Sequence, residues 1–114
     1  MILYLDSSAL VKRYIEETGS GWLRGTLETQ PQPTVVIGHL TLAELTSALM
    51  RRLRENLLTP SDYSRVQSIF RSDCQAAYEI AFAGGLAVDE ATRILENRPL
   101  RAYDAVQLAT ALLA

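Results

Sequence analysis

Residues 2–8 read Ile2-Leu3-Tyr4-Leu5-Asp6-Ser7-Ser8, an apolar run followed by one acid and two serines. The apolar run predicts a short buried strand, and the two serines that follow predict the start of a helix. Ligands of open α/β sheets bind in the crevice beyond the carboxyl ends of the strands. Asp6 lies at that point in the sequence, so it is the first candidate for a functional residue.

Two further apolar runs, Val35–Ile37 and Ile80–Phe82, are separated by long segments with helical periodicity. The segment 6–34 between the first two runs is long enough for crossover helices and far too long for a hairpin, which favours parallel strands. We therefore expect an α/β fold in which helices cover a central parallel sheet.

Capping residues and apolar spacing predict where the helices lie. Ser7 or Ser8 is expected to cap the first of six helices. The others are expected to begin near Trp22, at Thr41, at the run Thr59-Pro60-Ser61-Asp62, near Leu86 and near Ala102. The buried faces of the third and fourth are expected to be the stripes Leu42, Leu45, Leu49, Leu53 and Tyr63, Val66, Phe70, Cys74.

The chain has 114 residues, a length that favours a single domain over residues 1–114. Apolar residues make up 48% of it, so we expect a packed core rather than disorder. The net charge of −2 gives no general attraction for nucleic acid, so an RNA partner needs a local basic patch or a metal ion. The single cysteine, Cys74, and the lack of a long apolar run predict a cytoplasmic protein with no membrane span.

Asp6, Glu44 and Asp104 stand out among the acids because each lies among apolar or small residues near the beginning of an expected element. Each also has a purely structural explanation. Asp6 could cap the following helix, Glu44 could complete a capping box with Thr41, and Asp104 could complement a helix dipole. Taken one at a time, the residues leave both explanations open.

Three converging carboxylates require a cation, because like charges about 4 Å apart repel by roughly 4 kcal/mol at an effective dielectric of about 20. Oxygen ligands without a cysteine cluster, in a chain with one histidine, favour Mg²⁺ or Mn²⁺ over zinc. Such an ion can activate water and neutralise a phosphate during hydrolysis.

Basic and aromatic side chains give weaker signals. Arg51, Arg52 and Arg54 form the densest basic cluster, which could contact phosphates or could simply be an exposed helix face. We take Arg51 as a candidate substrate-binding residue. His39 could reach a substrate from the turn between strand and helix, although packing against the surface explains it more simply.

Three segments, MILYLDSSALVKRYIEETGS at the start, VVIGHLTLAELTSAL in the middle and LRAYDAVQLATALLA at the end, together resemble the PIN-domain ribonuclease toxins of the VapC type. The resemblance implies a three-layer α/β/α PIN-like domain. It implies that Asp6, Glu44 and Asp104 are catalytic and bind Mg²⁺ or Mn²⁺, and that Ser8 is a small polar residue near the substrate. It also implies an endoribonuclease that hydrolyses RNA and is bound by a cognate antitoxin protein, and we expect a homodimer.

The family usually continues beyond the helix that carries Asp104 into a further strand that ends in a fourth acid. This sequence ends at Ala114, so we expect a PIN-like domain that is short at its C-terminus and lacks the fourth acid. Three acids are still expected to hold one ion, with weakened catalysis.

Two other functions remain open. A catalytically weak or inert PIN-like module would act mainly by binding an antitoxin or a second copy of the chain. A phosphohydrolase that uses Asp6 as a nucleophile is less well supported, because such enzymes have a second aspartate where this chain has Ser8.

Overall fold

The computed structural model describes residues 1–114 and contains three strands and six helices. The strands are β1 (Ile2–Leu5), β2 (Thr34–Gly38) and β3 (Tyr78–Ala81). The helices are α1 (Ser7–Tyr14), α2 (Ser20–Leu27), α3 (His39–Arg54), α4 (Pro60–Ala76), α5 (Gly85–Asn97) and α6 (Ala102–Leu113). The predicted alternation of strands and helices is confirmed.

The sheet is parallel throughout, with the strand order β1-β2-β3. The first two strands lie where the apolar runs predict them, but β3 begins and ends earlier than the predicted run 80–82. The reason is the register: β2 ends at Gly38, opposite Ala81, so Phe82 has no partner strand. The Phe82 ring leaves the sheet and stacks on His39, with 4.5 Å between ring centroids.

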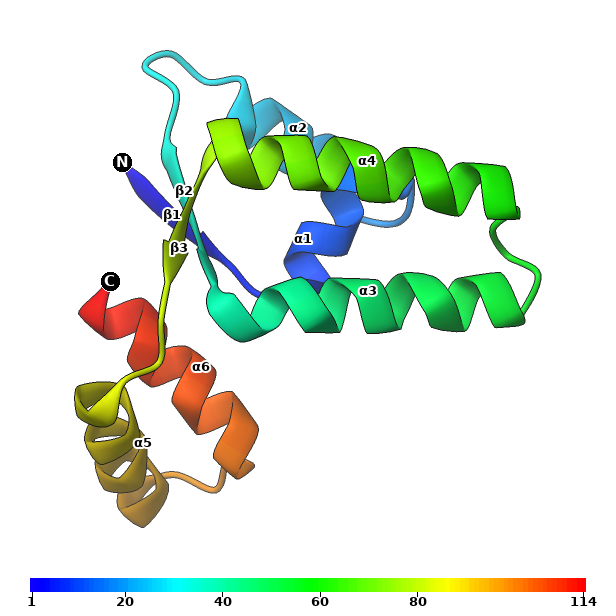
Figure 1. Ribbon diagram of the computed structural model, residues 1–114. Coiled ribbons are helices and arrows are strands. Elements are labelled where there is room, and N and C mark those ends of the chain that lie inside the picture. Colours follow the sequence, from blue (N-terminus) through cyan, green and yellow to red (C-terminus); the bar gives the residue numbers. More distant parts are fainter.

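Helices cover the sheet on both sides, with α1 to α4 on one side and α5 and α6 on the other (Figure 1). Successive side chains of a strand point to opposite faces of the sheet, so each strand contributes side chains to the helical layers on both sides. Leu5 and Ile37 belong to the main core on the α1–α4 side. Tyr4, the neighbour of Leu5, instead hydrogen-bonds to Gln107 of α6. The expected α/β/α arrangement around a parallel sheet is therefore confirmed.

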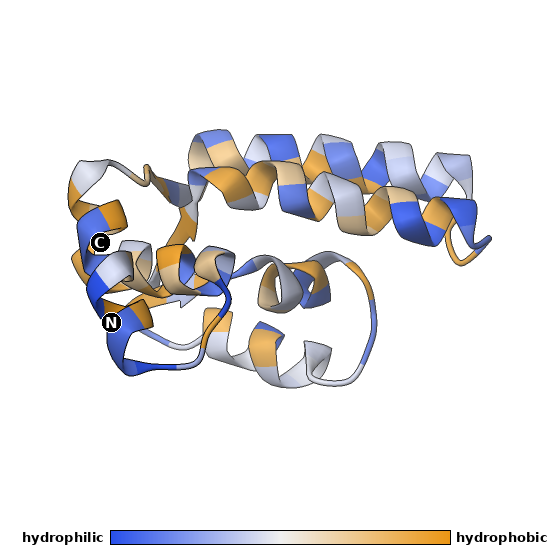
Figure 2. Cartoon of the chain, turned by 90° about the horizontal axis from the view of Figure 1, so that it is seen from below, coloured by the Kyte–Doolittle hydropathy of each residue, from blue (hydrophilic) through white to orange (hydrophobic).

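The main core is built by the predicted stripes of the two long helices. Leu45 and Leu49 of α3 are completely buried, and Val66 and Phe70 of α4 are nearly so. Hydrophobic and hydrophilic residues alternate along both helices, as expected for helices with one buried face (Figure 2). The two long helices therefore share one core with residues of β1 and β2, such as Leu5 and Ile37.

One helix cap and one helix start differ from the sequence prediction. The cap of α1 is Asp6 rather than a serine, because the Asp6 carboxylate accepts the Ala9 backbone N–H at 2.9 Å. The third helix starts at His39, directly after β2, so Thr41 lies inside the helix and is fully buried. The expected start of α4 is confirmed: Thr59 caps this helix, and Thr59 and Asp62 form a reciprocal capping box there.

The last two helices form a hairpin, which we call the α5–α6 hairpin, residues 85–113. It packs around a small alanine core, separate from the main core and made of Ala87, Ala91, Ala105 and Ala109. None of the helices combines the length and the apolarity that crossing a membrane requires.

Candidate active site

An open hollow of about 730 Å³ lies beyond the carboxyl ends of β1 and β2, and we call it the acidic hollow. Asp6, Glu44 and Asp104 all line it. They come from separate elements: Asp6 follows β1, Glu44 is in the second turn of α3, and Asp104 is in the first turn of α6. The structure thus brings the three candidate acids to one site, although they are far apart in the sequence.

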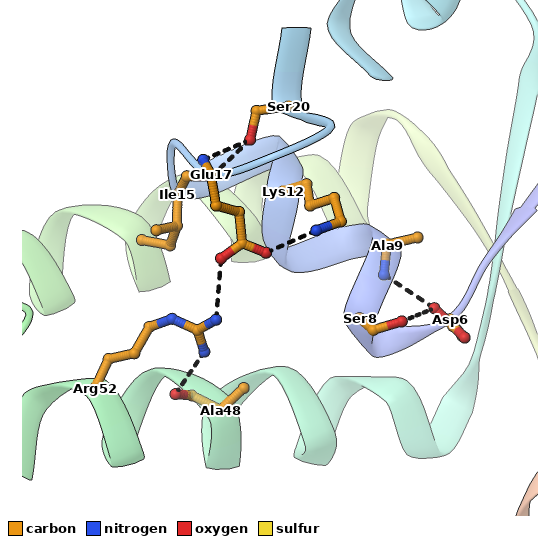
Figure 3. Close-up of polar contacts among 9 residues, drawn as sticks. All are labelled: Asp6, Ser8, Ala9, Lys12, Ile15, Glu17, Ser20, Ala48 and Arg52. Carbon is orange, nitrogen blue, oxygen red and sulfur yellow. Dashed lines mark hydrogen bonds and ion pairs between the residues drawn. The ribbon is translucent and has the colours of Figure 1, made fainter. Parts of the chain in front are cut away.

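Asp6 is held by its own helix start. Its Oδ1 accepts the Ser8 hydroxyl at 2.8 Å and the Ala9 backbone N–H at 2.9 Å (Figure 3). The capping explanation of Asp6 is therefore correct, yet both hydrogen bonds use one carboxylate oxygen. Ser8 lines the acidic hollow as well, so the second oxygen of Asp6 stays available beside a small hydroxyl.

Glu44 is oriented across the site by a neighbouring helix. Its Oε1 accepts a hydrogen bond from the side-chain amide of Gln107, at 3.0 Å. The capping box proposed for Thr41 and Glu44 is wrong, because α3 already begins at His39 and the Glu44 carboxylate engages Gln107 instead. The half-buried Glu44 thus turns toward the acidic hollow rather than toward the start of its own helix.

Asp104 forms an ion pair with Arg101, whose Nε lies 3.0 Å from Oδ2. The Arg101 side chain is 87% exposed, so water screens this pair and it contributes little to stability. Asp104 is in the first turn of α6, where a negative charge also complements the helix dipole. The dipole explanation and a ligand role for Asp104 are compatible.

The side chains of the acidic hollow match the donor chemistry of a hard divalent cation, since carboxylate oxygens are the ligands that Mg²⁺ and Mn²⁺ prefer. The match is in the chemical type of the donor atoms, not in the distances between them. No group of three or more Asp, Glu, His or Cys side chains lies close enough together in this structure to hold a metal ion. Metal binding by Asp6, Glu44 and Asp104 stays a prediction.

Two tyrosines at the site respond to its negative charge. Burial, the largest cause, raises the pKa of Tyr4, and the charges of Asp6 and Glu44 raise it further. Burial and a hydrogen bond with Glu44 raise the pKa of Tyr103 to about 12. Both phenols therefore keep their protons at neutral pH and act as hydrogen-bond donors.

Gln107, Tyr4 and Tyr103 are site residues that the sequence analysis missed. Gln107 accepts from the Tyr4 hydroxyl at 2.6 Å and donates to the Tyr103 hydroxyl at 2.8 Å. A signal for two of them does exist in the sequence. Gln107 lies three residues after Asp104, on the same helix face, and Tyr4 lies two residues before Asp6, on the same strand face.

The other candidates lie outside the acidic hollow. Arg51 lines a second, adjoining hollow that also contains Ser8 and Glu44. His39 is exposed and stacks on Phe82, as the surface-packing interpretation expects.

The protein is thus a small α/β domain with a parallel sheet and an acidic hollow at the carboxyl edge of that sheet. The PIN domain family matches residues 3–114, which is nearly the whole chain, so this chain belongs to the PIN-domain family. Membership supports nuclease chemistry, a hydrolysis, in general.

A crystal structure of VapC20 from Mycobacterium tuberculosis, described as a sarcin-ricin loop cleaving toxin, has a similar fold. The TM-score is 0.67 and the sequence identity 17%, and the match covers 94% of this chain and 78% of that chain. At this identity the likeness shows a shared fold. No curated protein gives a significant sequence match.

Proposed function

We propose that this chain is the toxin of a type II toxin–antitoxin system, an endoribonuclease that hydrolyses RNA phosphodiester bonds with Mg²⁺ or Mn²⁺. The observation that carries the proposal is the meeting of Asp6, Glu44 and Asp104 at one open hollow of a PIN domain. Fold similarity to the VapC20 toxin supports the more specific choice of a toxin and of RNA as substrate.

In this proposal, Asp6, Glu44 and Asp104 hold the ion and are the catalytic residues. When bound, the ion supplies an activated water and neutralises the charge of the phosphate. Ser8 fixes one oxygen of Asp6, which leaves the other for binding. Gln107 fixes Glu44 in the same way. Asp104 would be available to the ion, because its pair with the exposed Arg101 is screened by water and contributes little to stability.

The first experiment is isothermal titration of Mn²⁺ into three proteins: the native chain, Asp6→Asn and Asp89→Asn. Asparagine keeps the helix cap of residue 6 but removes its charge. Asp89 is an exposed acid of α5 outside the acidic hollow, so Asp89→Asn is the control with the same change of charge. We expect binding to the native chain and the control, and none to Asp6→Asn.

Cleavage is tested with a labelled RNA hairpin that carries the sarcin-ricin loop, the RNA named for VapC20, beside an unrelated hairpin. We expect Mn²⁺-dependent cleavage of an RNA by the native chain and by Asp89→Asn. A chelator or Asp6→Asn should abolish it. Cleavage that survives in Asp6→Asn with its full rate would contradict the assigned mechanism.

A second candidate function is a catalytically weak or inert PIN module that acts by binding an antitoxin or a second copy of the chain. One observation favours it: the carboxylates of the acidic hollow are not gathered within metal-binding distance. Failure of all three proteins to bind Mn²⁺, together with a stable complex with the antitoxin, would select this function.

The proposal also includes a cognate antitoxin and a homodimer as the resting state. Light scattering of the purified chain, alone and with the product of an adjacent reading frame, measures both. A monomer that binds no such product would leave the ribonuclease without its toxin–antitoxin role.

A further inference from the structure

A second hollow, of about 380 Å³, adjoins the acidic hollow and shares Ser7, Ser8 and Glu44 with it. Its character is different, because Lys12, Arg51 and Arg52 line it. We call it the basic hollow. Its only other acid is Glu17, so three cations face two carboxylates. The local charge is positive although the whole chain has a net charge of −2.

Glu17 divides its carboxylate between two of these cations (Figure 3). Its Oε1 lies 3.0 Å from the Lys12 ammonium, and its Oε2 lies 3.1 Å from the Arg52 guanidinium. The hydrogen bond from Lys12 is the largest cause that lowers the pKa of Glu17, and Arg52 adds to it. Glu17 is therefore charged at neutral pH and occupies both cations.

The backbone fixes Glu17 in this position. Its N–H donates to the Ser20 hydroxyl at 2.9 Å, and that hydroxyl donates to the Ile15 carbonyl at 3.0 Å. Ser20 is completely buried, so this turn is held from inside the protein. Gly19 completes the turn with φ +96°, and a Cβ there would lie 3.3 Å from Cδ of Lys12. The contact between Glu17 and Lys12 is therefore built into the fold.

Arg51 differs from the other two cations because it is exposed and has no ion-pair partner. It lies on the same face of α3 as Glu44 and Ala48, at the spacing of four and then three residues. Seven residues of helix place it about 10 Å along the axis from Glu44. One face of α3 therefore leads from the acidic hollow to an open arginine.

We propose that the basic hollow is a phosphate subsite for the RNA strand that is cut in the acidic hollow, with Arg51 as its open cation. Glu17 competes with the phosphate for Lys12 and Arg52, and so it limits the affinity for RNA. The inference rests on the proposed ribonuclease function, since it assigns the position of a neighbouring phosphate. Arginine suits this role because its fork of donors matches phosphate oxygens.

The test uses the Asp6→Asn chain, in which we expect the RNA to stay uncut, and a fluorescein-labelled single-stranded RNA whose anisotropy is measured over a range of salt concentrations. Adding Arg51→Gln should weaken binding several-fold and reduce the slope of log K against log salt by about 0.7, as for one lost phosphate contact. Arg54→Gln is the matched control, because Arg54 is exposed on the same helix and lines neither hollow. It should leave the slope unchanged.

The competing role of Glu17 is tested with Glu17→Gln in the same background. Releasing Lys12 and Arg52 should tighten RNA binding several-fold and steepen the salt slope. Glu16→Gln removes the same charge one residue earlier, where the exposed Glu16 pairs with Arg24, and should have no such effect. Equal tightening by both variants would mean that only net charge matters, which overturns the role of Glu17.

Two readouts separate failure of the subsite from failure of the ribonuclease. If Arg51→Gln and Arg54→Gln lose the same affinity while RNA is still bound, the proposed phosphate subsite is wrong and the proposed ribonuclease function is unaffected. The second readout is NMR titration with inorganic phosphate. Shifts at the Ser8 amide and the Arg51 side chain would support the subsite even in a chain that binds no RNA, and their absence would overturn it.

Discussion

The side-chain amide of Gln107 in α6 donates a hydrogen bond to the Glu44 carboxylate of α3, with N and O 3.0 Å apart. The same side chain accepts from the Tyr4 hydroxyl of β1, and its amide nitrogen lies 3.3 Å from the Thr41 hydroxyl. A single glutamine thus joins the sheet, the main helical layer and the α5–α6 hairpin at the edge of the acidic hollow.

Replacing Gln107 with leucine should lower the free energy of unfolding by about 1–3 kcal/mol, because it leaves part-buried groups such as the Tyr4 hydroxyl without a partner. Urea unfolding followed by circular dichroism measures the change. Gln75→Leu is the control, since Gln75 is exposed near the end of α4. A Gln107→Leu protein as stable as this control would show that the hydrogen bonds at Gln107 are replaceable by water.

Gly38→Ala should destabilise the fold by about 1–3 kcal/mol, because its methyl group has no room. A Cβ at this position would lie 2.6 Å from the Tyr4 hydroxyl and 3.1 Å from Oε1 of Gln107. In contrast, nothing lies within 4 Å of a Cβ at Gly25, inside α2. Gly25→Ala should therefore stabilise the protein, by about 0.5–1 kcal/mol. Thermal unfolding of both variants checks the opposite signs.

Leu49→Ala should cost about 2–5 kcal/mol, since it removes a fully buried side chain from the main core. Leu57→Ala, at a side chain that is 69% exposed, should change stability by less than about 0.5 kcal/mol. Denaturant unfolding measures the free energy of unfolding of the two variants, which are compared where the slope of this free energy against denaturant concentration is the same. The comparison tests whether the buried face of α3 stabilises the fold. A small effect at Leu49 would mean that the core collapses around the lost volume.

Stability should fall in alkaline solution, partly because of Tyr103. Its pKa in the folded protein is about 12, above the value of about 10 for an unfolded chain. The contribution of Tyr103 is fully present below the unfolded pKa and is lost as pH rises through the folded pKa. Unfolding temperatures measured across this window should fall less steeply for Tyr103→Phe than for the native chain. Identical slopes would assign the alkaline loss to other groups.

Much of the fold could be predicted because it depends on local pattern and chain length. The run Ile2–Leu5 and the long segment after it determine a parallel strand pair, and the Thr59 cap determines the start of α4. The start of α3 was missed because the end of β2, not the local Thr41 pattern, determines it. A local capping pattern does not form a cap when the tertiary structure buries its first residue inside a helix, as it does Thr41.

At the site, the three acids could be selected from their surroundings and from the family resemblance, but their contacts could not. The hydrogen bond between Tyr4 and Gln107 joins residues 103 positions apart, so it depends on how α6 lies against the sheet. Likewise, Glu44 contacts Gln107 instead of forming a capping box because α6 lies close to α3. Local sequence carries no information on either approach.

The α5–α6 hairpin has a dynamic consequence for the site. It carries Asp104, yet its own core consists of alanines, which bury little apolar surface. Opening of the hairpin should therefore cost less than global unfolding, so amide hydrogen exchange should be faster in α5 and α6 than in α3. Each opening would take Asp104 away while Asp6 and Glu44 stay with the main body. The fraction of molecules with a complete acidic hollow is then an equilibrium population, which any ligand that bridges the hairpin to the main body would increase.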